Sequence, residues 1–263
     1  MAGRKYFSGM NQQRIRLFDV PVDVTTLPDL LQEVESILLL KQRSKIMYLN
    51  INCMNYAYNN PRYRKTLNEA DVVYCDGAGI VLGARLMGIY LPGRMTGADW
   101  IYDLCELCER KGYSLFFLGG EPGIAEKAKE VLIKRFSKLL IIGTHHGYFT
   151  KNDNDILIFK INKLRPDILL VGLGTPLQEF WIDENFHKLN VPVVWAVGAV
   201  MDFVSGKLPR APKWMLNNGL EWLFRLLIEP SRMWKRYIIG NPLFILRVLK
   251  ERIRGMIYGD NSL

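Results

Sequence analysis

The chain has 263 residues, of which 49% are hydrophobic and 23% charged, and its formal net charge is +9. This length accommodates one sizeable α/β domain with an appendage, and the composition excludes wholesale disorder and fibrous repeats. No apolar run reaches the roughly 18 residues of a membrane-spanning helix, and no apolar segment follows the basic start of the chain as in a secretory leader. We therefore expect a cytoplasmic protein that does not span a bilayer.

The first elements predicted along the chain are a strand over residues 15–24 and a helix over 27–40 with Thr25 or Thr26 as N-cap. Six short apolar runs then alternate with helical stretches, as βαβ units require. The runs cover residues 45–51, 71–75, 114–118, 139–143, 167–173 and 192–197. Because strands covered on both faces are almost continuously apolar, we predict an α/β fold with a doubly wound, mostly parallel sheet flanked by helices.

Glycines and polar residues follow five of these runs. In such a sheet ligands bind beyond the carboxyl ends of the strands, and glycines there let backbone N–H groups approach a diphosphate. The segments are Asn50-Ile51-Asn52, Asp76-Gly77-Ala78-Gly79, Gly119-Gly120-Glu121-Pro122-Gly123, Gly172-Leu173-Gly174-Thr175-Pro176-Leu177-Gln178-Glu179 and Gly198-Ala199-Val200-Met201-Asp202. The glycines after the third run do not complete G-x-G-x-x-G and no Walker lysine follows, so a dinucleotide or ATP site is weakly supported. The five ends together predict a binding crevice.

Asp76 is the sharpest candidate for chemistry. It follows an apolar strand and precedes a hydrophobic helix, so its carboxyl group lies where partial burial raises the pKa toward that of a general base. Capping of the following helix is the alternative role, because aspartate is a preferred N-cap residue.

Three further residues have two readings each. The Arg94 guanidinium, before a helix that Asp99 can cap, suits bidentate phosphate binding or a surface ion pair. Gln178 and Glu179 fall in the first turn of a helix opened by Thr175-Pro176, where both side chains can point into the crevice. The alternative is a capping box in which Thr175 pairs with Gln178.

No metal site is expected. The run Asp153-Asn154-Asp155 lies in a polar turn before a helix, where such residues are expected as caps. A second ligand pair is missing for the C-x-x-C of Cys105 and Cys108. These thiols, with Cys53 and Cys75, are interpreted as reduced and structural.

The positive charge is concentrated near the C-terminus. Residues 1–206 carry 24 basic and 22 acidic residues, whereas residues 207–254 carry eleven basic and three acidic residues. Large aromatic and aliphatic residues accompany these cations, a mixture that favours an anionic membrane surface over a merely solvated face or a stripe that tracks nucleic-acid phosphates. No nucleic-acid motif is present, so no nucleic-acid partner is expected.

We therefore divide the chain into a catalytic α/β domain over residues 1–206 and a helical, basic, membrane-associating appendage over 207–263. Pro230 and the Gly240-Asn241-Pro242 break divide the appendage into about three helices. Its basic residues keep helical spacing at positions 232, 235 and 236 and again at 247, 250 and 254, so each piece can present one charged face.

The ordered motifs make the chain resemble a known family. They are Asn50-x-Asn52, Asp76-Gly-x-Gly, Arg94-x-x-Gly-x-Asp99, Phe117-Leu-Gly-Gly120, Gly172-x-Gly-x-Pro-x-Gln178-Glu179, Gly206-x-x-x-Arg210-Ala-Pro, Gly219-Leu-Glu-Trp222-Leu-x-Arg225-Leu and Glu229-Pro-Ser-Arg232. Over roughly residues 15–240 the chain closely resembles the WecG/TagA/CpsF glycosyltransferases.

That resemblance implies an inverting transfer of a sugar from a UDP-sugar donor to a polyprenyl diphosphate-linked acceptor in bacterial envelope polysaccharide synthesis. It implies a peripheral protein at the inner face of the plasma membrane, no D-x-D metal site and no cofactor. Members commonly self-associate, so a homo-oligomer is compatible with the resemblance. A non-catalytic nucleotide or nucleotide-sugar binding protein that docks on membranes is the alternative.

The resemblance also implies roles for particular residues. Asp76 corresponds to the catalytic base, and Asn50 stands where several relatives have a threonine. The expected substrate-binding residues are Asn50, Asn52, Arg94, Gly119, Gly120, Gly174, Gln178, Glu179, Asp202 and Arg225. The expected membrane or acceptor contacts are Arg210, Arg232, Lys235 and Arg236.

Overall fold

The computed structural model describes residues 13–258, and its centre is a six-stranded parallel sheet with the strand order β4-β3-β8-β7-β5-β6. The strands are β3 (Ser44–Leu49), β4 (Val72–Cys75), β5 (Ser114–Gly119), β6 (Leu140–His145), β7 (Ile168–Gly172) and β8 (Val193–Ala196). Each strand coincides with one of the six apolar runs, with ends that differ by at most two residues. The predicted fold class is confirmed, and every neighbouring pair in this sheet is parallel.

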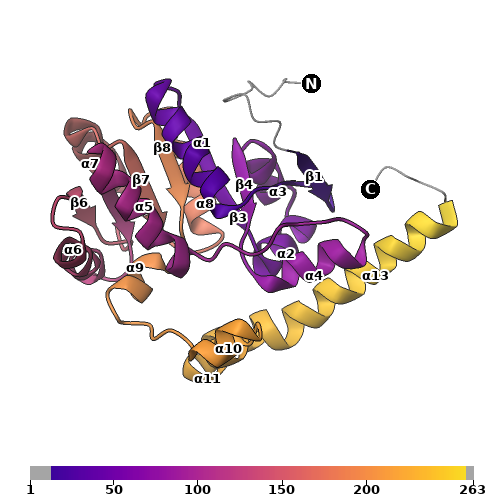
Figure 1. The fold of residues 1–263 in the computed structure, drawn as a ribbon. Helices are drawn as coiled ribbons and strands as arrows, with labels where there is room; N and C mark the ends of the chain where they lie inside the picture. Colours follow the sequence, from indigo (N-terminus) through magenta and orange to yellow (C-terminus); the bar gives the residue numbers. More distant parts are fainter. Residues whose placement is uncertain (1–12, 259–263) are drawn as a thin grey trace.

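Helices cover both faces of this sheet (Figure 1). One row of contacts joins α1 (Leu27–Leu39), α5 (Gly97–Lys111), α9 (Val200–Val204) and α6 (Ile124–Arg135). A second row joins α2 (Ile51–Asn59), α3 (Pro61–Asn68) and α8 (Leu177–Asn185), and α7 (Lys151–Leu164) is hydrogen-bonded to α8. Helices α1 and α8 both pack on β8, from opposite sides, which is the arrangement of a doubly wound sheet.

The predicted strand over residues 15–24 is wrong in one respect, because two strands form there. Strands β1 (Arg14–Leu17) and β2 (Val20–Asp23) pair as an antiparallel hairpin. Phe18 and Asp19 form the turn, and both have positive φ, as a two-residue hairpin with the native twist requires. Neither residue is glycine or asparagine, so the usual sequence signal for this turn is missing. Thr26 caps α1 in a capping box with Asp29, as the N-cap prediction allowed.

The carboxyl ends of the strands lie at one edge of the sheet, and three of them come very close together. A Cβ atom at Gly119, the last residue of β5, would collide with the carbonyl oxygen of Gly172 at the end of β7. A Cβ atom at Gly172 would come within 2.5 Å of the carbonyl oxygen of Gly198, after β8. Glycine is therefore required at this edge because backbone packs directly on backbone.

The C-terminal segment is helical from residue 213. It contains α10 (Lys213–Asn217), α11 (Glu221–Ile228), α12 (Pro230–Trp234), a π-helical turn η1 (Lys235–Ile239) and α13 (Gly240–Tyr258). Pro230 separates α11 from α12 as predicted, but Gly240-Asn241-Pro242 does not interrupt the helical conformation. The N–H of Gly240 bonds to the carbonyl of Lys235, and this wider turn leads directly into α13. Pro242 falls in the first turn of α13, where a missing N–H costs little.

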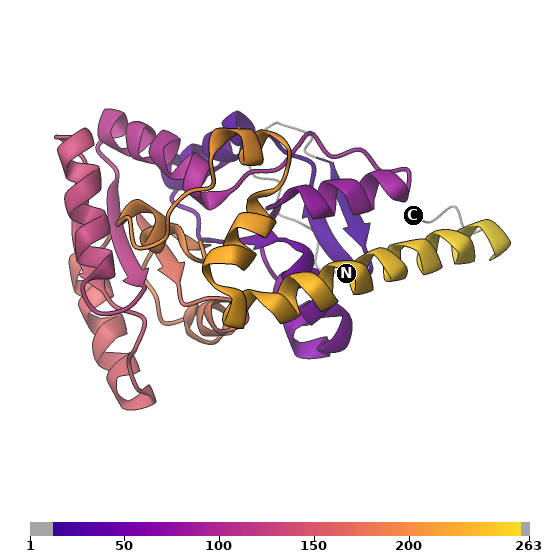
Figure 2. The same cartoon turned by 90° about the horizontal axis from the view of Figure 1, so that it is seen from below.

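Helix α13 packs across α2 and α4 (Ala78–Leu86), and its far end extends past the body (Figures 1 and 2). Phe244 and Val248 are buried, and a Cβ atom at Gly83 of α4 would come within 2.5 Å of the Phe244 ring. Arg247 also faces the body: it donates to Asn55 at 2.6 Å and lies 3.9 Å from the Tyr58 ring centroid. Of the three basic residues predicted to share one charged face of this helix, Arg247 therefore packs against the body, whereas Lys250 and Arg254 are exposed.

Within residues 13–258, no helix has both the length and the apolar character needed to cross a bilayer. The basic start of the chain and residues 259–263 of the predicted appendage lie outside the described residues. The division at residue 206 stays a prediction. Between Ser205 and the start of α10 at Lys213 the chain forms no helix or strand.

Candidate active site

Asp76 directly follows β4 and does not cap the next helix. Gly77 is the N-cap of α4 and makes no side-chain cap bond, so the capping alternative for Asp76 is excluded. The backbone N–H of Asp76 donates to the carbonyl of Leu49 at 2.8 Å, which ties the end of β4 to the end of β3. The half-buried carboxylate therefore lies at the edge of the sheet formed by the strand ends and is not used as a helix cap.

Asn50 orients this carboxylate. Its Oδ1 accepts the backbone N–H of Cys53 at 3.1 Å and caps α2, while its Nδ2 lies 3.4 Å from Asp76 Oδ2. Asn52 lies in the first turn of α2. Its half-buried side chain has no hydrogen-bond partner among residues 13–258. Of the two asparagines predicted to bind substrate, Asn52 is therefore the one with free polar groups.

The pKa of Asp76 is raised to about 6. Burial is the main cause; the Asn50 hydrogen bond and the Arg236 charge oppose it, the Glu221 charge adds to it, and the Arg225 charge opposes it. A carboxylate with this pKa is largely ionised at neutral pH yet accepts a proton more readily than an ordinary aspartate. The sequence prediction of a raised pKa is confirmed.

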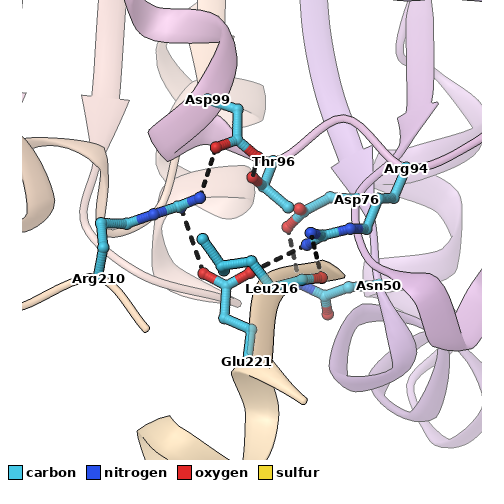
Figure 3. A network of polar contacts seen from close by, with 8 residues as sticks. All are labelled: Asn50, Asp76, Arg94, Thr96, Asp99, Arg210, Leu216 and Glu221. Atoms are coloured by element: carbon cyan, nitrogen blue, oxygen red, sulfur yellow. Dashed lines mark hydrogen bonds and ion pairs between the residues drawn. The ribbon is translucent and has the colours of Figure 1, made fainter. Parts of the chain in front are cut away.

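Arg94 forms an ion pair rather than standing free. Its Nη1 lies 3.0 Å from Glu221 Oε2 and its Nη2 donates to the carbonyl of Leu216 at 3.3 Å. The Glu221 carboxylate also pairs with Arg210, whose Nη1 lies 3.3 Å from Glu221 Oε1. Figure 3 shows Glu221 between the two guanidinium groups, with Asp76 and Asn50 beside them. Of the two readings of Arg94, the structure has the ion pair.

Asp99 binds side chains at the start of α5. Thr96 is the N-cap of that helix, and the Thr96 hydroxyl donates to Asp99. Arg210 donates to the other oxygen of Asp99 and so links α5 to the segment before α10. Arg210 was expected at the membrane or acceptor, but in this structure it joins Asp99 to Glu221.

Gln178 and Glu179 are fully buried, so their side chains do not stand open in the crevice. Gln178 Nε2 donates to Tyr48 Oη at 3.0 Å and to Glu179 Oε1 at 2.9 Å, and Oε1 accepts the N–H of Gly198 at 3.0 Å. No Thr175–Gln178 capping box forms; the Thr175 hydroxyl lies 3.0 Å from Glu179 Oε1 instead. These bonds fasten the ends of β3, β7 and β8 beneath the crevice.

The directions of these hydrogen bonds are fixed by the donors. Since Gln178 donates to Tyr48, the Tyr48 hydroxyl proton goes to Thr175 at 3.2 Å, and the Thr175 proton goes to Glu179. Burial raises the pKa of Glu179, against the hydrogen bonds from Gln178 and Thr175. The four side chains form a closed polar ring in a buried place, where an unpaired group would be costly.

The predicted glycines differ in surroundings. Gly119 and Gly120 lie against backbone or Ile124, whereas a Cβ atom at Gly174 would meet nothing within 4 Å, so only Gly174 borders open space. Asp202, near the end of β8, lies 3.6 Å from Lys207 Nζ. Burial raises the pKa of Asp202, and the charges of Lys207 and Arg232 oppose this.

The predicted arginines of the appendage act on different acids. The charges of Arg225 and Arg236 both act on Asp76, whereas Arg232 acts on Asp202. Arg225 lies over the Phe203 ring at 5.3 Å, and its Nε is buried without a hydrogen-bond partner within residues 13–258. Lys235 is exposed and lies over the Trp234 ring at 5.6 Å, away from this group.

Sequence reasoning missed two residues of this site, Glu221 and Tyr48. Glu221 stands in the motif Gly219-Leu-Glu-Trp222, but no role was assigned to it, because an acidic residue at the start of a helix ordinarily complements the helix dipole. Tyr48 lies inside an apolar run and was counted as core. Asp153 forms a capping box with Thr150 on α7, and all four cysteines are buried and free, as the interpretations of these residues required.

Comparison of the sequence with known proteins identifies the family. The model of the family described as Glycosyl transferase WecG/TagA/CpsF family matches residues 15–257. A Bacillus spizizenii protein named N-acetylglucosaminyldiphosphoundecaprenol N-acetyl-beta-D-mannosaminyltransferase is 34% identical over 195 residues, 74% of each chain. A protein of the same name from Staphylococcus aureus is 25% identical over 248 residues, 92% of this chain and 94% of the relative. The chain therefore belongs to the WecG/TagA/CpsF family of glycosyl transferases.

Proposed function

We propose that this protein is an inverting glycosyltransferase that moves a sugar from a UDP-sugar to a polyprenyl diphosphate-linked acceptor in bacterial cell-envelope polysaccharide synthesis. The names of the two relatives supply the acceptor class, a diphosphoundecaprenol-linked amino sugar. The observation that carries the proposal concerns Asp76, which follows β4 and does not cap a helix. Its pKa is about 6, and the charges of two arginines act on it.

The reaction is a single displacement. Asp76 takes the proton of an acceptor hydroxyl as its oxygen attacks the anomeric carbon, and the bond from that carbon to the diphosphate breaks on the opposite face. UDP leaves with the bonding electron pair, and the configuration at the carbon inverts. The β-linked mannosaminyl product in the relatives' names fits this course, provided the donor is α-linked.

Backbone amides and arginines suit the departing diphosphate. The helices α6 and α8 begin just beyond the glycine-rich ends of β5 and β7, so their N-terminal N–H groups lie at the crevice edge. Arg225 offers a buried Nε that lacks a partner among the described residues, and Arg236 adds a second positive charge near Asp76. Preorganised cations at a developing negative charge are a large contribution to catalysis.

The appendage supports a peripheral position at the inner face of the plasma membrane. Its exposed large apolar residues are Trp214, Trp222, Leu227, Ile228, Trp234, Ile238, Ile239, Leu243, Leu246, Leu249 and Ile253. Its exposed basic residues among those described are Lys207, Lys213, Arg232, Lys235, Lys250, Arg252 and Arg254. Apolar groups that enter the headgroup region beside cations that bind anionic lipid are typical of interfacial helices.

Release of UDP from a panel of UDP-sugars, with a short prenyl diphosphate-linked N-acetylglucosamine as acceptor, tests the proposal. UDP-N-acetylmannosamine is the first donor to try because of the relatives' names. We expect acceptor-dependent UDP release and a β-linked product by NMR. Binding of UDP-sugars without turnover on any acceptor would instead support the non-catalytic alternative, and a retained α configuration would contradict inversion.

A further inference from the structure

The helix that carries Arg225 has no fully buried side chain. In α11 (Glu221–Ile228) the apolar residues Leu223, Phe224 and Leu226 are only half-buried, whereas Met215 before it and Met233 after it are buried. Arg225 lies over the Phe203 ring of α9, and Glu221 adds ion pairs to arginines outside the helix. Polar contacts therefore contribute much of what holds α11 to the body.

Glu221 bridges two arginines that come from different parts of the chain. Its Oε2 lies 3.0 Å from Arg94 Nη1 and its Oε1 lies 3.3 Å from Arg210 Nη1. Only 16% of the Glu221 side chain is accessible, and about a quarter of each arginine side chain. Water screens such partly buried pairs less than exposed ones, so the contacts hold more firmly than surface ion pairs.

Each arginine also has a second anchor. Arg94 donates to the carbonyl of Leu216 in α10, and Arg210 donates to Asp99 in α5. The alternating charges of Asp99, Arg210, Glu221 and Arg94 thus connect α5, the segment before α10, α11 and the segment after α4, around Asp76 (Figure 3).

We propose that Glu221 is a positioning residue, and that the Arg94–Glu221–Arg210 clasp holds α11 so that Arg225 faces the crevice beside Asp76. The proposal rests on the proposed transferase function. It adds a role for the Glu221 carboxylate, which takes no part in the bond changes of the reaction. It also assigns Arg94 to holding the appendage in this arrangement, in place of direct phosphate binding.

The clasp predicts a specific effect on the ionisation of Asp76. The largest effects of charged groups on Asp76 come from Arg236, Glu221 and Arg225 of the appendage, and the Arg94 guanidinium lies beside it (Figure 3). Its other titratable neighbours are Tyr48, Tyr74 and Cys75 from β3 and β4, and burial raises the pKa of each, so they stay neutral. Loss of the Glu221 charge alone lowers the pKa of Asp76, whereas release of Arg225 raises it. Opening the clasp combines these opposing shifts, so the acid limb of the pH–rate profile moves less than loss of the charge alone would move it.

Glu221→Gln and Glu221→Ala in the full chain, assayed by UDP release, test the inference. The matched control is Glu251→Gln, at a half-buried acid of α13 whose nearest cation, Arg254, is 3.8 Å away. We expect kcat/KM to fall about 10-fold or more in both Glu221 variants, with little shift of the acid limb, and no change in the control. An acid limb at lower pH with unchanged kcat/KM would show that Glu221 acts only through its charge, and would overturn the positioning role.

Hydrogen exchange separates this inference from the proposed function. In both Glu221 variants the amides of residues 213–228 should exchange faster, while those of β3, β7 and β8 keep their protection, which shows that the body is folded. Unchanged exchange over residues 213–228 would overturn the clasp. If the unmodified protein transfers no sugar, the transferase function fails, and the exchange measurement still decides whether the clasp exists.

Discussion

The side-chain amide of Asn50 serves Asp76 and helix α2 at once: its nitrogen lies 3.4 Å from the Asp76 carboxylate and its oxygen caps the helix at the N–H of Cys53. One residue therefore sets both the position of the helix start and the orientation of the proposed base. The two duties can be separated by substitutions that keep the cap and change the group facing Asp76.

Asn50→Asp keeps a good N-cap but replaces a hydrogen-bond donor with a second negative charge next to Asp76. A like charge at this distance raises the pKa of Asp76 above about 6, so the acid limb of the pH–rate profile should move up by roughly one pH unit. Asn50→Thr, which keeps the cap and a hydroxyl donor, is the control and should move the limb less. Equal profiles for both variants would show that Asn50 does not act on the base.

Asp76→Asn should lower kcat by about 10²- to 10⁴-fold, the usual contribution of general-base catalysis, with little change in the affinity for UDP. Steady-state UDP release and UDP titration calorimetry measure the two quantities. The exposed Asp155, paired only with Lys188 at 3.0 Å, gives the control Asp155→Asn, which should keep full activity. An active Asp76→Asn enzyme would remove Asp76 from the mechanism.

The same substitution should stabilise the fold in a pH-dependent way. The pKa of Asp76 is about 6 in the folded protein against 3.8 for an ordinary aspartate, so folding favours the protonated form and stability falls as pH rises through this window. Above pH 7, Asp76→Asn should raise the free energy of unfolding by about 1 to 3 kcal/mol, and below about pH 4 the difference should vanish. Urea unfolding at several pH values measures this. A destabilised variant at pH 8 would contradict the raised pKa.

Tyr48→Phe opens the buried ring of Tyr48, Thr175, Gln178 and Glu179. It leaves one N–H of Gln178 without its acceptor at 3.0 Å, and an unpaired buried donor costs about 1 to 3 kcal/mol of stability. Chemical denaturation measures the loss. Tyr90→Phe, at a tyrosine that is 77% exposed, should stay within about 0.5 kcal/mol of the unmodified protein. Equal stability of both variants would show that the ring contributes nothing.

Charge reversal at Lys250 and Arg254, which lie four residues apart on exposed parts of α13, should weaken binding to anionic vesicles. Each basic residue near such a surface contributes about 1 kcal/mol, so the double reversal should lower the partition coefficient about 30-fold or more, and added salt should reduce the difference. Vesicle sedimentation measures it. The reversal of Lys160 and Lys163 on α7, at the far edge of the sheet, is the control. Equal loss in both pairs would indicate nonspecific attraction.

The sheet could be predicted from the sequence because its signals are local. Each strand is a short, continuous apolar run, and each run is followed by glycine or a polar residue at the crevice edge. The hairpin turn at Phe18-Asp19 was missed because phenylalanine rarely adopts the left-handed conformation that the first turn position requires, although aspartate tolerates it at the second. The continuity at Gly240 was missed because proline was taken to end a helix, whereas here it begins one.

The partners of the site residues could not be predicted, because they are set by packing between distant segments. Arg94 and Glu221 are 127 residues apart in sequence, and only the fold shows that they pair. In the same way Gln178 has the residue type of a substrate contact, but the approach of β3 to β8 buries it beneath Tyr48 and Gly198. Residue type indicated where the crevice lies, and burial decided which side chains remain free in it.

The crossing of α13 over α4 has a mechanical consequence. At Gly83 the Phe244 ring rests on bare helix backbone, with no side chain between them to yield. The two helices therefore pack as closely as backbone and ring allow, and α4 starts two residues after Asp76. Any side chain added at Gly83 would force the Phe244 ring and helix α13 away from α4, close to the turn that carries the proposed base.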